Sequence, residues 1–134
     1  VSPRLIPTAI QAALRQIGFD ATNGAQTREF NFIHDMVEAL LRASRPECEG
    51  EILNLGGGEE HSIQTVVNRI YALTGADPNS VRWGALPHRA GEVERFYGDH
   101  TTANEKLGSR PRTGLDEGLR ATIEWWRSSG VLED

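Results

Sequence analysis

The sequence predicts an α/β chain that is rich in helix and poor in strand. About five segments of the 134 residues carry apolar side chains at helical spacing, whereas only two or three short runs are typical of strands. The chain is 38% hydrophobic and 25% charged, a composition typical of a domain with a packed core. So few strands cannot form a layered sheet of their own, which indicates that a partner for this fold lies outside the chain.

The first predicted helix begins at Ser2 and Pro3 and ends at Gly18. Serine caps a helix with its hydroxyl group, and proline suits the first helical position. The apolar residues of this segment recur at helical spacing. They are Leu5, Ile6, Ala9, Ile10, Ala13 and Leu14.

The next segment predicts a turn, a strand and a second helix. Asn23-Gly24 is a turn signal, and residues 28–33 (REFNFI) alternate as a strand does. Asp35 is expected to cap the helix that follows, with Glu38 completing an acidic variant of the capping box. The buried stripe of this helix is predicted to be Met36, Val37, Leu40 and Leu41.

A second strand and a third helix are predicted after a loop rich in proline and glycine. The apolar run 51–55 (EILNL) is typical of a short strand, which the three glycines at 56–58 end. Ser62 caps the third helix and Gly75 closes it. The stripe of this helix is Ile63, Val66, Val67, Ile70 and Leu73.

The last part of the chain is irregular before it becomes helical again. Residues 81–83 predict a short strand, and Asp99 caps a helix that covers residues 103–107. Thr113 begins the final helix and Gly130 ends it. One side of this helix carries Leu115, Leu119, Ile123 and Trp126.

Charge, cysteine content and hydropathy exclude several classes of function. The formal net charge of −5 and the pI near 5.4 argue against a protein that binds the nucleic-acid backbone, which needs a basic face. Cys48 is the only cysteine, which fits a reducing compartment, and we expect a cytoplasmic protein. No apolar run approaches the roughly 18 residues that span a membrane, and no signal segment opens the chain. The four histidines lie far apart in the sequence, so no metal site is expected.

Three segments carry residues that can bind a phosphate. Arg28 follows a tight turn and opens a strand, where its planar guanidinium can reach a phosphate or pair with a nearby acid such as Glu29. The glycines at 56–58 have the layout of a phosphate cradle, but the acids that follow favour a simple tight turn. The loop 87–92 (PHRAGE) either holds a diphosphate and a sugar hydroxyl or is a solvated turn.

Five segments of the chain follow one another in a recognisable order and spacing. They are RLIP at 4–7, GAQTREFNFIHD at 24–35, NLGGG at 54–58, RAGE at 89–92 and LGSRPRTGLDEGLRATIEW at 107–125. Together they resemble the carboxyl-terminal, substrate-binding half of the extended short-chain dehydrogenases that act on nucleotide sugars, the 4-epimerases and 4,6-dehydratases. The resemblance implies that residues 1–134 form one helix-rich lobe, with few short strands, of a two-lobe Rossmann-type enzyme.

The resemblance also implies a set of substrate-binding residues. Arg28 and Arg89 match arginines that contact the nucleotide diphosphate from opposite sides. Glu92 matches an acidic position that reaches the ribose, and Asn54 matches a position near the nucleotide. The remaining matches, which line or flank the base, are Arg4, Leu5, Phe19 and Ala21. The family usually has aspartate where this chain has Glu29 and Glu92, which keeps the charge and lengthens the arm.

Two motifs of the family are absent from this chain. The glycine-rich dinucleotide loop is missing, and neither Tyr71 nor Tyr97 has a lysine four residues on, since Lys106 is the only lysine. No catalytic residue is therefore predicted here, and hydride chemistry cannot be performed by this chain alone. The resemblance implies that NAD or NADP lies on the missing amino-terminal half. It also implies that the strand at 52–55 would join the edge of the missing sheet.

The function implied by the resemblance is a supporting one. The chain would hold the nucleotide diphosphate of a sugar substrate while the amino-terminal half of an NAD(P)-dependent 4-epimerase or 4,6-dehydratase performs the chemistry. A stand-alone nucleotide-sugar binding module, or a non-catalytic remnant that acts through protein interaction, is the alternative. Dimers in this family usually form through helices of the missing half, so a homodimer of the parent is also implied.

Overall fold

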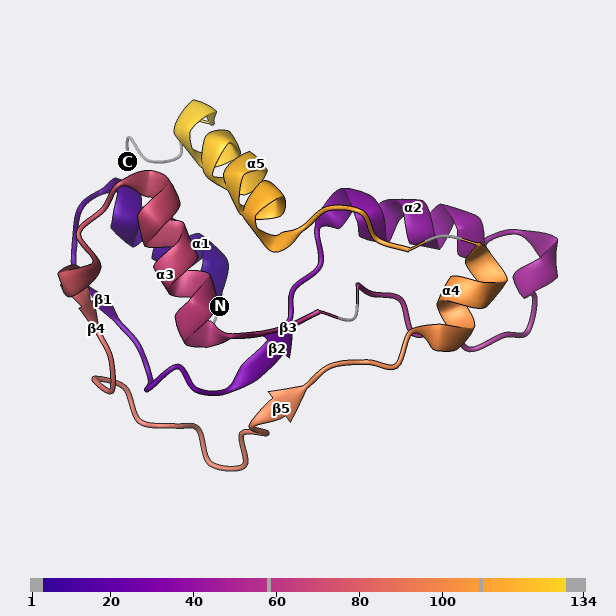
Figure 1. Ribbon diagram of the computed structural model, residues 1–134, viewed down its shortest axis with the longest axis horizontal. Coiled ribbons are helices and arrows are strands. Elements are labelled where there is room, and N and C mark those ends of the chain that lie inside the picture. The colour runs from indigo at the N-terminus through magenta and orange to yellow at the C-terminus, as the bar shows by residue number, and fades with distance from the viewer. Residues whose placement is uncertain (1–3, 58, 109, 130–134) are drawn as a thin grey trace.

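The computed structural model describes residues 4–57, 59–108 and 110–129 (Figure 1). It confirms the α/β class that was predicted, with five α-helices and five very short strands in the described ranges. The helices are α1 (Leu5–Leu14), α2 (Ile33–Ala43), α3 (Ile63–Thr74), α4 (Thr101–Leu107) and α5 (Leu115–Ser128). The strands are β1 (Phe19–Asp20), β2 (Thr27–Glu29), β3 (Glu60–Ser62), β4 (Val81–Arg82) and β5 (Arg95–Phe96). Two single 3₁₀ turns are η1 (Pro46–Cys48) and η2 (Pro78–Ser80).

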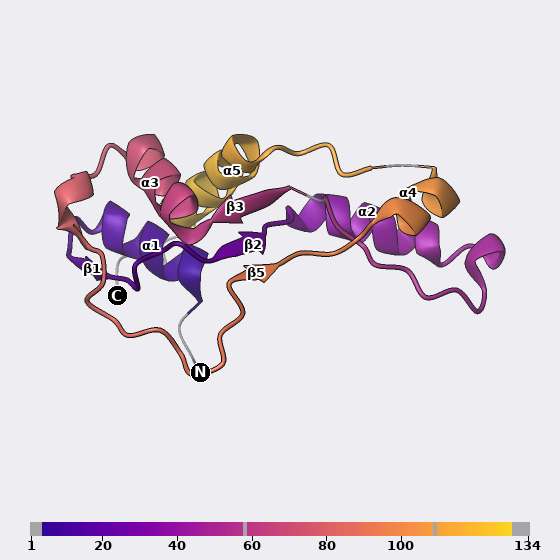
Figure 2. The same ribbon diagram turned by 60° about the horizontal axis from the view of Figure 1, so that its bottom comes forward.

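A small three-stranded sheet lies between the two helical ends of the molecule (Figure 2). Its order is β3-β2-β5, with β2 antiparallel to β3 and parallel to β5. Arg28 is in the central strand and pairs in register with His61 on one side and Phe96 on the other. A second pair, β1 with β4, is parallel and joins Phe19 to Val81.

The main hydrophobic core lies where α1, α3 and α5 pack together (Figure 1). Its fully buried side chains include Ile10, Val66, Val67, Ile70 and Tyr71. Burial of an isoleucine or valine side chain contributes about 1.5–3 kcal/mol, so this bundle accounts for most of the hydrophobic stabilisation of the chain. The stripes predicted for these helices are confirmed, although the stripe of α1 also includes Ala12.

The caps of α3 agree with the sequence. The Ser62 hydroxyl accepts a hydrogen bond from the Thr65 backbone N–H at 3.0 Å. Gly75 ends the helix with a φ of +73°, in the left-handed region that favours glycine. Both signals are local, because each needs only the residues within one helical turn.

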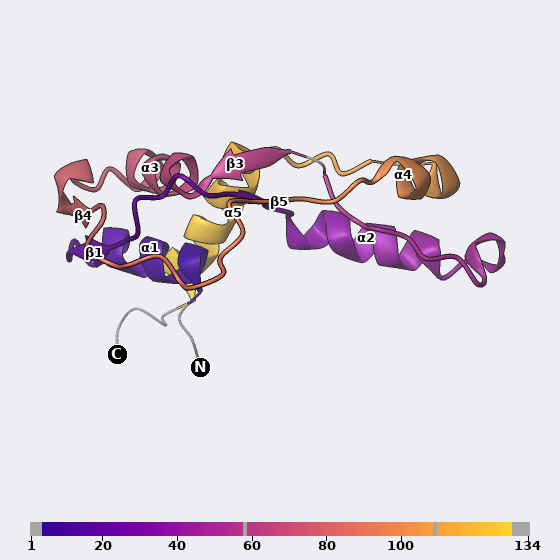
Figure 3. The ribbon, with the colours of Figure 1, turned by 90° about the horizontal axis from the view of Figure 1, so that it is seen from below.

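The predicted buried stripe of α2 is wrong for this chain. No residue of α2 is buried, and Val37, Leu40 and Leu41 are 46%, 59% and 68% exposed. The helix projects to the end of the molecule beside α4, as the edge-on view shows (Figure 3). The apolar periodicity is present, but no described element covers this face.

The predicted strand at 51–55 is also absent. Residues 51–55 run as extended chain without a strand partner among the described residues, and Ile52 is 94% exposed. Leu53 and Leu55 pack partly against a small second cluster of Cys48, Ala103 and Leu107. A strand forms only where a neighbouring strand pairs with its backbone, and no described strand lies in that position.

The strand predicted at 28–33 and the cap predicted at Asp35 both differ from the structure. The strand predicted at 28–33 is limited to β2, because α2 already begins at Ile33. Asp35 lies inside the first turn of α2 and accepts the backbone N–H groups of Arg112 and Thr113, at 3.3 and 3.0 Å. The carboxylate of Asp35 thus joins α2 to the segment before α5, and the predicted capping box with Glu38 does not form.

Several predicted helix ends are shifted. Helix α1 ends at Leu14, four residues before the predicted end at Gly18. The chain turns away from the helix at Gln16, whose φ is +53°. Helix α5 begins after Gly114, not with a Thr113 cap. Asp99 does act at the start of α4, since its carboxylate accepts the Thr101 N–H at 3.0 Å. The predicted signals at Ser2, Pro3 and Gly130 lie outside the described residues.

Candidate phosphate-binding site

The turn before β2 brings Arg28 into the sheet. The Asn23 side chain accepts the Ala25 N–H at 3.0 Å, and Gly24 has a φ of +72°. A Cβ on Gly24 would lie 2.6 Å from the ring of Trp83, so no other residue fits this turn without movement. The predicted turn is therefore confirmed, and the central strand β2 begins shortly after it.

Arg28 and Arg89, which are far apart in the sequence, lie at one open hollow in the structure. The hollow is lined by Arg28, Arg89, Ala90, Gly91, Glu92, Val93 and Phe96. We call it the arginine hollow. Three of the residues predicted to bind substrate are therefore brought together, namely Arg28, Arg89 and Glu92.

Hydrogen bonds orient the Arg28 side chain within the hollow. Its Nη1 donates to the carbonyl oxygens of Thr27 and Glu94, at 2.6 and 3.3 Å. Its Nη2 forms an ion pair with Glu92 Oε1 at 2.9 Å. The acid that pairs with Arg28 is therefore Glu92, not the neighbouring Glu29, and the Arg28 side chain is about three-quarters buried, with an exposure of 25%.

Glu92 holds a central position among the charged groups of the hollow. Besides Arg28, it faces His88 Nδ1 at 3.8 Å, while the Gln26 amide lies 3.5 Å from its Oε1. Both arginines and a single acid line the hollow, so cationic side chains outnumber acidic ones at this point of an acidic protein. Such a local excess suits a small dianion more than an extended polyanion.

The other predicted substrate residues do not line the arginine hollow. Asn54 donates from Nδ2 to the Asp99 carbonyl at 3.3 Å and lies with a different cluster, described below. Arg4 is exposed just before α1, and Leu5 packs partly against the core. Phe19 and Ala21 are buried in the core with exposures of 7% and 5%, where β1 and the residue after it lie beside β4, whose Val81 is in the same core. Their side chains therefore have packing roles, and contact of these residues with a base stays a prediction.

Sequence reasoning missed a buried charged pair at the other end of β2. Glu29 Oε2 accepts from His100 Nε2 at 2.7 Å and from the Gly98 N–H at 3.1 Å. Glu29 Oε1 accepts from the Gly57 N–H at 2.9 Å and from the Asn31 amide at 3.0 Å. The side chains of Glu29 and His100 are only 9% and 7% exposed. The two residues are 71 positions apart, so no sequence spacing could have indicated the pair.

The second nitrogen of His100 completes this cluster. Nδ1 lies 2.9 Å from the backbone oxygen of Asn54. Burial lowers the pKa of His100, but the hydrogen bond to Asn54 and the hydrogen bond and charge of Glu29 outweigh it and raise the pKa above its ordinary value. We call Glu29, His100 and their partners the junction cluster.

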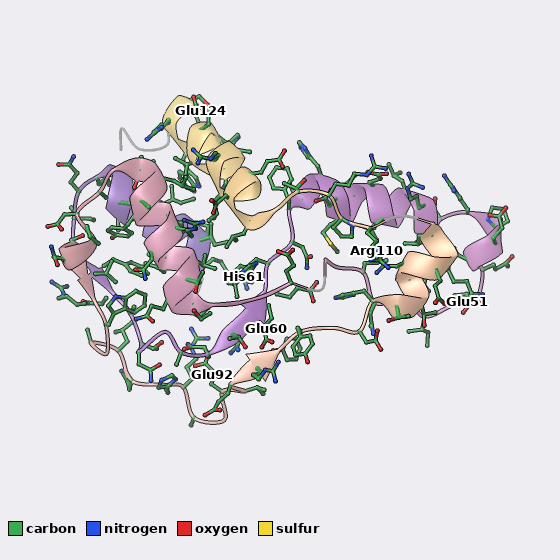
Figure 4. All side chains as sticks on the ribbon, in the orientation of Figure 1. Glu51, Glu60, His61, Glu92, Arg110 and Glu124 are labelled. Carbon is green, nitrogen blue, oxygen red and sulfur yellow. The ribbon has the colours of Figure 1, made fainter. Side chains whose placement is uncertain are left out.

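A second ion pair crosses the outer face of the sheet. Glu60 on β3 pairs with Arg95 on β5 at 2.7 Å and also accepts from Thr27 on β2 between them. Glu60 and Glu92 are both labelled at the sheet in Figure 4. The hydrogen bond from Arg95 lowers the pKa of Glu60 to about 2, and Arg95 also lies 5.3 Å above the Tyr97 ring. This pair joins all three strands that position the arginine hollow.

The described part of the chain offers neither a metal cluster nor a membrane-spanning helix. No group of three or more His, Cys, Asp or Glu side chains there is arranged to hold a metal ion. None of the helices in the described ranges is both long and apolar enough to cross a membrane.

Comparison with known proteins adds independent evidence. The chain is 35% identical over 129 residues to UDP-N-acetyl-alpha-D-glucosaminuronate decarboxylase from Bacillus cytotoxicus, covering 92% of this chain and 40% of that protein. The UDP-glucose 4-epimerase of Thermotoga maritima, solved with UDP-glucose, superposes with a TM-score of 0.85 and 28% identity, over 96% of this chain and 41% of that one. The dTDP-glucose 4,6-dehydratase DesIV of Streptomyces venezuelae, solved with NAD bound, has a TM-score of 0.86 and 27% identity, over 95% and 39%.

Two facts follow from these comparisons. The chain spans about 40% of the length of the relatives that it matches. Residues 1–122 match the family model described as GDP-mannose 4,6 dehydratase. The resemblance carried by the five sequence segments is thus confirmed, and the chain belongs to the GDP-mannose 4,6 dehydratase family of nucleotide-sugar epimerases and dehydratases.

Proposed function

We propose that this chain is the nucleotide-sugar binding lobe of an NAD-dependent epimerase or 4,6-dehydratase, and that the arginine hollow binds the diphosphate. The observation that carries this proposal is the convergence of Arg28 and Arg89 on one hollow from separate segments of the chain. Guanidinium groups bind phosphate oxygens with paired, charge-assisted hydrogen bonds. Two of them facing one hollow match the two phosphates of a nucleoside diphosphate.

Glu92 takes part in this binding by exchanging partners. The Nη1 side of Arg28 is held by two carbonyl oxygens, so the side available to a ligand is Nη2, which now pairs with Glu92. A phosphate oxygen replaces the Glu92 carboxylate at Nη2. The released carboxylate then accepts a hydrogen bond from a ribose hydroxyl, which is the role that the family resemblance implies for this position.

The exposed apolar surface supports an amino-terminal partner half. Leu40, Leu41 and Ile52 are 59%, 68% and 94% exposed, and large exposed apolar side chains gathered on one part of a protein mark an interface. We propose that α2 and the extended segment 51–55 dock against the dinucleotide-binding half, where 51–55 gains a strand partner. Such docking disfavours the stand-alone module, because that module would leave these side chains in water.

Hydride chemistry is not assigned to any residue of this chain. NAD is bound in the DesIV structure, and we propose that the corresponding cofactor of the parent lies on the amino-terminal half. What this chain contributes is binding energy and orientation, which place the sugar against the reacting atoms. A cytoplasmic location and a homodimer of the parent belong to the same proposal.

Calorimetric titration of the full-length natural protein with UDP, dTDP and GDP tests the proposal. Arg28→Ala and Arg89→Ala should each weaken binding by more than about 1.5 kcal/mol, because each removes charge-assisted hydrogen bonds. Arg120→Ala is the matched control, since Arg120 is exposed on α5, outside the arginine hollow. Wild-type affinity in both Arg28→Ala and Arg89→Ala would contradict the proposed diphosphate site.

A further inference from the structure

We propose that His100 is a positioning residue for the arginine hollow, and that its doubly protonated ring, together with Glu29, keeps β2 and β5 in the geometry that binds the diphosphate. This inference rests on the proposed function, because it assigns a regulator of affinity to the same site. The family resemblance assigned no role to His100, and Glu29 was expected only as a partner of Arg28.

The contacts of the His100 ring determine its protonation. Nδ1 faces the backbone oxygen of Asn54 at 2.9 Å, and a carbonyl oxygen can only accept a hydrogen bond. Nε2 faces Glu29 Oε2 at 2.7 Å, an oxygen that already accepts from the Gly98 N–H. Both ring nitrogens therefore carry a proton, and the buried ring is an imidazolium paired with a carboxylate.

The charged groups around the ring favour this state. On β2, the Glu29 carboxylate faces the ring. Within its own segment, the charge of the neighbouring Asp99 favours the protonated ring. Glu105 and Arg110 line the open hollow on its outer side, with opposite charges. From the segment 54–57 the ring meets the Asn54 carbonyl and lies beside Gly56, and Tyr97 lines the same hollow. The raised pKa of His100 is consistent with this arrangement.

The cluster is connected to Arg28 through a short stretch of backbone. Glu29 follows Arg28 in β2, and consecutive strand residues point to opposite faces. Arg28 therefore lines the arginine hollow, while Glu29 belongs to the junction cluster. Phe96 pairs with Arg28, and Gly98, which donates to Glu29, follows two residues later. At the other end of the same pairing, the Glu94 carbonyl accepts from the Thr27 N–H at 2.7 Å and from Arg28 itself. Loss of the His100 proton therefore loosens one of the two ends that hold the Arg28 register.

The test combines nuclear magnetic resonance of the His100 ring nitrogens with UDP titration of the full-length natural protein between pH 6.5 and 9.5. We expect two ring protons on His100 at pH 7, and UDP affinity that falls about tenfold as the ring loses its charge, equivalent to about 1.4 kcal/mol. His100→Gln should bind UDP about tenfold more weakly at pH 7 and lose this pH step. Glu29→Gln should move the step to lower pH, because the carboxylate that favours the imidazolium is gone. His34→Gln, an exposed histidine on α2, should keep the wild-type profile.

Each outcome decides between the two ideas. A neutral His100 at pH 7 in the wild-type protein overturns the positioning role, as does a His100→Gln variant with wild-type affinity and pH profile, while the proposed function stands. A wild-type protein that binds none of UDP, dTDP and GDP at any pH refutes the proposed function and this inference with it. If His100→Gln does not fold, the wild-type pH step and its shift in Glu29→Gln still decide the matter.

Discussion

Replacing Gly56 by alanine should destabilise the protein, because the junction cluster fills the space beside this glycine. A Cβ at Gly56 would collide with Glu29 Oε1 and lie 2.6 Å from His100 Cε1. Neither group can turn away without giving up hydrogen bonds, since both are more than nine-tenths buried. Breaking a buried ion pair costs about 3–5 kcal/mol, so we expect Gly56→Ala to lower the free energy of unfolding by about 3 kcal/mol.

Urea denaturation of the full-length protein measures this effect. With a urea dependence of about 2 kcal/mol per molar, a loss of about 3 kcal/mol moves the midpoint down by about 1.5 M. Gly57→Ala is the matched control, because the nearest atom to a Cβ there is Asn31 Oδ1 at 3.3 Å, which needs to shift by a few tenths of an ångström, and Pro111 lies at ordinary contact distance. Equal midpoints for Gly56→Ala and Gly57→Ala would refute the reasoning. A second check is additivity: in a Glu29→Ala background, Gly56→Ala should cost much less, because the nearest colliding atom is gone.

Two further predictions concern the sheet and the exposed helix. Glu60 has its pKa lowered to about 2 by Arg95, so the stability it contributes is present above its ordinary pKa and is lost as the pH falls from about 4.5 towards 2. Glu60→Gln should abolish this acid-side loss in a pH series of unfolding curves, and an unchanged acid limb would argue against the pair. Leu41→Glu should lower the free energy of unfolding of the full-length protein by about 2 kcal/mol if α2 docks on the amino-terminal half, since a leucine of this size is then buried. The same change at Ile17, exposed at 53% beyond α1, is the control, and equal stability of both variants would exclude docking through Leu41.

Local signals and family segments could be predicted from the sequence. The cap and stop of α3, Ser62 and Gly75, depend on neighbours within one turn, so they hold whatever surrounds the helix. The apolar stripes of α1 and α5 predicted faces that the structure confirms as core. The two arginines of the site were also predicted, but through the family resemblance. From chemistry alone, a surface arginine paired with an acid was the favoured interpretation of Arg28.

Only the tertiary structure decided which apolar faces are covered and which charges meet. The periodicity of α2 is the same whether or not another element packs on it, and in this chain its Leu40 and Leu41 remain exposed. The run at 51–55 has strand composition, but no strand pairs with it among the described residues. Asp35 has the spacing of a cap, yet the backbone of Arg112 and Thr113 competes for its carboxylate.

The sequence by itself thus determined the helices, the cap and stop of α3 and the family to which the chain belongs, because these depend on neighbouring residues or on matched segments. The tertiary structure determined that Arg28 meets Glu92 and that Glu29 meets His100. These pairs join positions more than sixty residues apart, and β2 sends its consecutive side chains to opposite faces. The partners of a charged side chain depend on the folded path of the backbone, and the spacing of residues along the sequence does not reveal that path.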